Sequence, residues 1–177
     1  MRPGTFVALR SSISWDAGLG TAWRTEVTIS HDVVERAARV VLETNASVKI
    51  VGAKQSNETD GAFSELIGTL SFVGKLGGTL VVYCKWQQAV ELAAGMLGEV
   101  GTEPDAETVR DAMGEMVNQI GGTIKRNIGA DGNEIMLSPP VVVSGSPLSH
   151  CVRSSQKPVA VDLDLGQGTF GVCLWPA

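Results

Sequence analysis

Residues 109–128 read VRDAMGEMVNQIGGTIKRNI, and their apolar side chains recur with the period of an amphipathic helix. At about 100° per residue, these apolar positions fall on one stripe. The stripe consists of Val109, Met113, Met116, Val117, Ile120, Ile124 and Ile128. The opposite sector holds Asp111, Glu115, Asn118 and Gly122, because residues four, seven and eleven positions apart return to one face. We therefore expect two carboxylates and a carboxamide in a row on the solvent side of a helix that packs on the core.

The polar row does not by itself name a reaction, because a polar face opposite an apolar stripe is what any surface helix shows. No His, Cys or Ser partner accompanies the acids in this segment, so the row contains no nucleophile–base pair. Gly121 and Gly122 follow directly, although a glycine inside a helix costs about 0.5–1 kcal/mol relative to alanine. Such residues leave room for another group to approach closely.

Elsewhere in the chain, apolar periodicity and turn residues predict further helices and strands. The predicted helices cover residues 30–44, 85–97 and 104–128. The predicted strands cover residues 47–53, 63–72, 79–84, 134–144, 159–165 and 169–175, and Pro139 and Pro140 interrupt the fourth of them. The polar run 54–61 predicts a loop, and glycine-containing turns at 74–78 and 166–168 join neighbouring strands. This order predicts an α+β fold, in which one N-terminal helix and two central helices pack against a largely antiparallel sheet of about six strands.

The ends of the predicted helices follow from residues with known end preferences. Ser30 or Asp32 suits the N-cap of the first helix, and Gly98 suits the end of the second. Pro104 is tolerated in a first helical turn, where Asp105 and Glu107 face the positive end of the helix dipole.

The composition predicts one acidic globular domain. The chain has 177 residues, of which 44% are hydrophobic, and this length is enough for one well-buried core. Lys and Arg number 14 against 19 Asp and Glu, a net charge of -5 that argues against a nucleic-acid-binding domain. No apolar run approaches the roughly 18 residues that a membrane span needs, so we expect a cytoplasmic protein with no membrane partner.

The cysteines and histidines predict no metal site. Cys84, Cys151 and Cys173 are scattered without a CxxC pair, which indicates core thiols in a reducing compartment. His31 and His150 lie far apart, and neither has a second ligand at zinc spacing. We therefore expect no metal bound by this chain and no covalent hydrolase chemistry.

The polar row of the 109–128 helix has a spacing that belongs to a known family. The pattern is an acidic residue, then a glutamate after three intervening residues, then an asparagine after two more. In this chain these residues are Asp111, Glu115 and Asn118, and Pro139 and Pro140 follow later. In this pattern the chain resembles the CheX branch of the CheC-like chemotaxis phosphatases, whose motif also ends on a later proline. The spacing from Asn118 to the prolines is slightly short against the family pattern.

The resemblance extends beyond the motif. It includes MLGE at 96–99, QIGG at 119–122 and LSPPV at 137–141, and it covers about residues 30 to 175. It implies a CheC-like fold, with residues 30–177 as a CheX-like domain and residues 1–29 as an N-terminal extension without an assigned role.

The resemblance implies that the chain hydrolyses the aspartyl phosphate of a CheY-type response regulator in chemotaxis or two-component signalling. Asn118 would orient the attacking water, and Glu115 would contact the partner's active-site lysine. Asp111 would either add to that contact or be solvated surface. The partner-facing surface would also include Gly121, Gly122, Pro139 and Pro140. The chain would need no cofactor of its own, since the Mg²⁺ ion would belong to the response regulator.

The first predicted helix does not repeat the motif, because Ala38 stands where Glu35 would need an asparagine. The resemblance therefore implies one site per chain, and it further implies a homodimer. Two other functions stay open: a CheX-like adaptor that binds a receiver domain without hydrolysis, and a structural module of the flagellar switch type. The presence of both Glu115 and Asn118 favours the enzyme, because an adaptor would not need the carboxamide.

Overall fold

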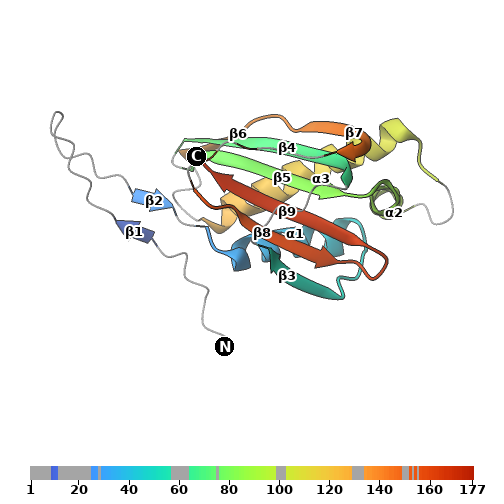
Figure 1. Cartoon of the computed structure of the whole chain (residues 1–177), viewed down its shortest axis with the longest axis horizontal. Coiled ribbons are helices and arrows are strands. Elements are labelled where there is room, and N and C mark those ends of the chain that lie inside the picture. The colour runs from blue at the N-terminus through green and yellow to red at the C-terminus, as the bar shows by residue number, and fades with distance from the viewer. Residues whose placement is uncertain are drawn as a thin grey trace.

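Figure 1 shows the fold as a computed structural model of the chain. The structure describes residues 9–11, 25–27, 29–56, 64–74, 76–98, 103–128, 134–148, 152, 154 and 156–177. The helices are α1 (His31–Asn45), α2 (Trp86–Leu97) and α3 (Ala106–Asn127). The strands are β1 (Leu9–Ser11), β2 (Thr25–Val27), β3 (Gly52–Ser56), β4 (Ser64–Gly74), β5 (Gly78–Cys84), β6 (Ile135–Leu137), β7 (Val141–Leu148), β8 (Val159–Asp164) and β9 (Thr169–Pro176).

Seven of the described strands form one sheet. Its order is β3-β8-β9-β5-β4-β6, with β7 also beside β4, and every pairing is antiparallel. The predicted hairpins β4–β5 and β8–β9 are both present. β1 and β2 pair with each other in a separate two-stranded sheet. The α+β prediction is confirmed.

The segment 134–144 is interrupted at the two prolines as predicted, but counting it as one strand is wrong. It is divided into β6, which pairs with residues 72–74 of β4, and β7, which pairs with residues 64–69. Pro139 and Pro140 stand between them, and a proline has no N–H for the ladder. Ser138 makes the junction: its N–H donates to the Ser71 carbonyl at 2.9 Å, and its Oγ accepts from the Ser71 N–H at 2.9 Å.

The strand predicted at 47–53 lies instead at Gly52–Ser56, so part of the predicted polar loop is β3. β3 is an edge strand that pairs only with β8 among the strands described. Lys54 and Gln55 are exposed there, which an edge strand tolerates because it borders solvent. Pairing with a strand that lies far along the chain decides this position, and the local residue preferences do not show it.

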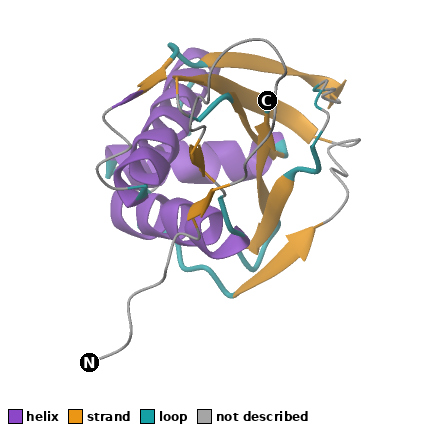
Figure 2. Cartoon of the chain, turned by 90° about the vertical axis from the view of Figure 1, so that its left-hand side faces the viewer, coloured by secondary structure: helices purple, strands orange, loops and turns teal. Residues whose placement is uncertain are grey.

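All three helices cover one face of the sheet, as Figure 2 shows. The predicted apolar stripe of α3 is confirmed: its residues are fully buried, and Ile128 is nearly so. Gly68 of β4 allows α3 to lie directly on the sheet, because a Cβ at Gly68 would stand 2.5 Å from Cγ2 of Val117. The opposite face of α3 is thereby turned to solvent.

The helix ends agree with the sequence preferences in part. Gly98 ends α2 in the left-handed conformation at φ 68°, as predicted. α3 begins at Ala106, behind Asp105 as the N-cap, whose carboxylate accepts from the Thr108 N–H at 2.8 Å. That hydrogen bond from Thr108 holds the pKa of Asp105 below its ordinary value. α2 lacks a cap side chain of its own, and Glu65 of β4 accepts from the Trp86 N–H at 2.9 Å instead.

Candidate functional site

The solvent-facing side of α3 carries the polar row that the sequence predicts. Asp111, Glu115 and Asn118 are all exposed, while Met116 and Val117 between them are fully buried. Helical spacing therefore places two carboxylates and one carboxamide on a surface that another protein can reach.

A groove of about 550 Å³ runs along one side of this row. Its lining residues are Arg110, Asp111, Gly114, Glu115, Asn118, Pro140 and Val142. Gly114 is at ordinary contact distance from the opposite wall, because a Cβ there would stand 3.8 Å from Cγ of Pro140. The structure thus places Pro140 beside the motif residues of α3. Pro139 is exposed and does not line the groove.

A second hollow of about 400 Å³ lies between α1 and α3. Its lining residues are Val40, Val41, Thr44, Asn45, Asn118, Gln119, Gly122, Thr123, Arg126 and Leu137. Asn118 borders both hollows, so its carboxamide stands on the ridge between them. Gly122 is half-buried and lines the second hollow, where a partner can approach it.

Gly121 does not lie on this surface. It is buried, and a Cβ there would stand 2.9 Å from Cδ2 and 3.3 Å from Cδ1 of Leu70 in β4. The absence of a side chain therefore makes room for the chain's own sheet. The interpretation of Gly121 as a partner-contacting residue is wrong: Gly121 precedes Gly122 of the polar face by one position, and a helical step of about 100° turns it toward the core.

Gln119 is a residue of the site that the sequence reasoning missed. Its Nε2 donates to Oε1 of Glu115 at 2.6 Å, across one helical turn. Its Oε1 accepts in turn from Nδ2 of Asn45, the last residue of α1. The four-residue spacing of Glu115 and Gln119 is a signal that could have found the first contact. The second contact depends on the packing of α1 against α3.

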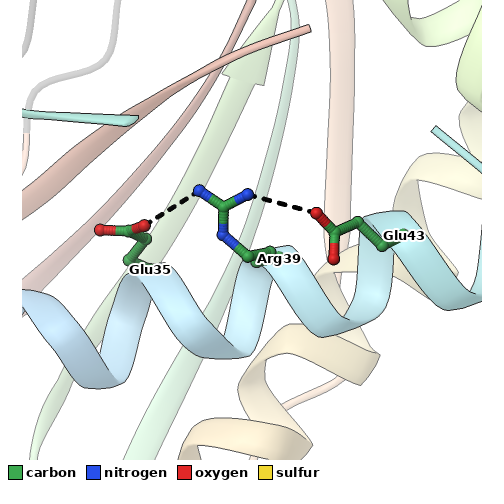
Figure 3. Close-up of polar contacts among 3 residues, drawn as sticks. All are labelled: Glu35, Arg39 and Glu43. Carbon is green, nitrogen blue, oxygen red and sulfur yellow. Dashed lines mark hydrogen bonds and ion pairs between the residues drawn. The ribbon is translucent and has the colours of Figure 1, made fainter. Parts of the chain in front are cut away.

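α1 presents a different polar pattern at the place where a second motif would stand. Arg39 lies between Glu35 and Glu43, at 3.1 Å and 3.2 Å from their carboxylates (Figure 3). The hydrogen bond to Glu35 is the main cause that raises the pKa of Arg39. Ala38 is fully buried and cannot orient a water at the surface. Part-exposed ladders of this kind contribute a few tenths of a kcal/mol per pair, so this one is a helix-stabilising feature.

The thiols do not take part in the site. Cys84 and Cys173 are buried and free, and burial raises the pKa of each to about 12, so both stay protonated near neutral pH. Cys151 and His150 lie outside the described residues.

In the part of the chain that the structure describes, no three His, Cys, Asp or Glu side chains gather where they could hold a metal ion. Among the described helices, none is long and apolar enough to cross a membrane.

The chain is similar to known proteins both in family and in fold. A family model described as "Chemotaxis phosphatase CheX" matches residues 66–164, which is more than half of the chain. This span includes the whole polar row of α3 and both prolines. No curated protein matches the chain in a sequence search.

Solved structures share the fold. The chemotaxis protein CheX from Vibrio vulnificus has a TM-score of 0.72 at 24% identity, covering 82% of this chain and 97% of its own. A CheX in a complex with CheY, BeF3 and Mg from Borrelia burgdorferi has a TM-score of 0.71 at 18% identity, covering 82% and 96%. FliY from Thermotoga maritima is more distant, with a TM-score of 0.57 at 18% identity, covering 82% and 85%.

Proposed function

We propose a function for this chain, which belongs to the chemotaxis phosphatase CheX family. In this proposal, the chain hydrolyses the aspartyl phosphate of a CheY-type response regulator in the cytoplasm. The observation that carries the proposal is the joint exposure of Glu115 and Asn118 on one face of α3, beside an open groove. The complex of a CheX of the same fold with CheY, BeF3 and Mg supports a receiver domain as the partner.

Hydrolysis of an acyl phosphate asks mainly for a water held in line and for neutralised charge, and it needs little help from a base. A carboxamide suits the first task, because its oxygen can accept from a water while its nitrogen donates to a neighbouring oxygen. Asn118 stands on the ridge between two hollows, so its carboxamide can enter the active site of another protein. In this proposal Asn118 orients the attacking water.

Glu115 has the complementary task of docking. It lies one helical turn before Asn118, on the same exposed face. A carboxylate there forms a charge-assisted hydrogen bond with the active-site lysine of a receiver domain, which sets the position of Asn118. Asp111, one turn further, lines the same groove and adds negative charge toward the same cation.

The Mg²⁺ ion of the reaction belongs to the response regulator in this proposal, and this chain supplies no ligand to it. When bound to the regulator, the ion would supply charge neutralisation at the phosphoryl oxygens. This chain then contributes Asn118, which holds the attacking water in line with the phosphorus atom and keeps it from other orientations.

The proposal is tested by the decay of a phosphorylated CheY-type receiver from the same cell, with Mg²⁺ present. Catalytic amounts of this chain are expected to accelerate the decay through many turnovers. Binding without acceleration would identify an adaptor instead, and a lack of binding to any receiver of that cell would contradict the proposal.

We also propose that the chain is a homodimer. Val73, Met136, Val141 and Val143 are each at least half exposed, and their registers place them together at the β6/β7 border of the sheet. Among the described strands, β6 and β7 pair only with β4, so their outer edges are unpaired. An exposed apolar strand edge of this kind suits a second copy of the chain. Light scattering coupled to size exclusion is expected to give twice the chain mass; a monomeric mass at micromolar concentration contradicts the proposal.

A further inference from the structure

Two hydrogen bonds in series connect the end of α1 to the docking carboxylate of α3. Asn45 Nδ2 donates to Gln119 Oε1, and Gln119 Nε2 donates to Glu115 Oε1 at 2.6 Å. Asn45 and Gln119 are half-buried, whereas Glu115 is exposed. The series therefore begins at the packed contact between two helices and ends at the surface where a partner would bind.

The donor at Asn45 decides which way the Gln119 amide faces. A carboxamide has one acceptor side and one donor side, and Asn45 occupies the acceptor side. The donor side is thereby directed at Glu115, one helical turn away. The bond uses Oε1 of Glu115, and no described residue forms a hydrogen bond with Oε2, which can therefore accept from a cation of the partner.

We infer that Gln119, held by Asn45, is a positioning residue that orients Glu115 for docking on the receiver's lysine. The inference rests on the proposed function. An exposed glutamate otherwise samples several rotamers, and ordering it on binding reduces affinity. Gln119 restricts that sampling before the partner arrives, so its contribution is expected in the affinity for the receiver and not in the chemical step.

The test measures dephosphorylation against the concentration of phosphorylated receiver, together with the Kd for a beryllofluoride-loaded receiver. Gln119→Leu keeps the approximate volume and removes both hydrogen bonds. We expect KM and Kd to rise about 2- to 12-fold, with kcat unchanged because Asn118 is intact. A merely destabilised variant would behave differently, because loss of folded protein lowers the apparent kcat and leaves KM in place.

Asn45→Asp tests the direction of the series. A carboxylate at this position can only accept, so the Gln119 amide turns over and presents its oxygen to Glu115. The same rise in KM and Kd is expected, although Gln119 itself is unchanged. Gln87→Leu is the matched control, because Gln87 donates to Glu91 with the same spacing on α2, at 3.4 Å and away from the site. It should leave KM, Kd and kcat unaltered.

A double-mutant cycle shows whether Gln119 acts through Glu115. In a Glu115→Ala background, Gln119→Leu is expected to produce no further rise in Kd. An additive rise would overturn the inference, as would an unchanged Kd in the single variant or a fall in kcat alone. A wild-type chain that neither binds nor dephosphorylates a receiver refutes the proposed function, and the inference with it. An active wild type with an unaffected Gln119→Leu variant refutes the inference alone.

Discussion

Replacing Asn118 by alanine is expected to lower the kcat for receiver dephosphorylation by about 100-fold or more, because the attacking water loses the group that holds it in line. Asn118 is exposed on α3 and borders both hollows. It makes no hydrogen bond within the described residues that the fold depends on, so the free energy of unfolding should change little. The Kd for a beryllofluoride-loaded receiver should stay close to that of the wild type, since Glu115 remains to dock.

The measurement is the turnover of phosphorylated receiver in the presence of Mg²⁺, at saturating receiver, for the wild type and for Asn118→Ala. Asn127→Ala is the matched control, because Asn127 is an exposed asparagine at the end of the same helix and lines neither hollow. That control should retain wild-type turnover. If Asn118→Ala retains it as well, Asn118 does not orient the water and the mechanism fails at its central residue.

Ile120→Ala is expected to destabilise the chain by about 2–5 kcal/mol, the range for truncating a buried isoleucine to alanine. Ile120 is fully buried on the stripe of α3 that packs against the sheet, next to Gly121 and its contact with Leu70. The truncation leaves a cavity that the close approach of α3 and β4 cannot easily fill. Urea unfolding of the wild type and the variant measures the loss.

Val51→Ala is the control for this effect, because Val51 is 66% exposed and its truncation should change the unfolding free energy by less than about 0.5 kcal/mol. The folded fraction of Ile120→Ala should still dephosphorylate the receiver, since no motif residue is altered. A loss below about 1 kcal/mol would mean that α3 is not tightly packed on the sheet.

The sequence pattern of α3 by itself determined which of its residues are exposed at the site. Seven apolar positions at helical spacing specify which side faces the core, and the remaining positions then carry Asp111, Glu115 and Asn118 to the surface. Hairpins with short glycine-containing turns, such as β8–β9, are equally local and were predictable for that reason. The family motif lies within a single helix, so the sequence was sufficient to identify it.

Contacts between distant segments were decided only by the tertiary structure. The place of β3 depends on pairing with β8, and Pro140 reaches the motif because β7 lies beside β4. The lack of a side chain at Gly121 lets α3 approach Leu70 of the sheet, and the residue that donates to Gln119 is Asn45 at the end of α1. Periodicity reports which face of an element is apolar, but it does not report which element lies opposite. The hydrogen bonds that orient Glu115 begin at a helix crossing, and a crossing exists only once the chain has folded.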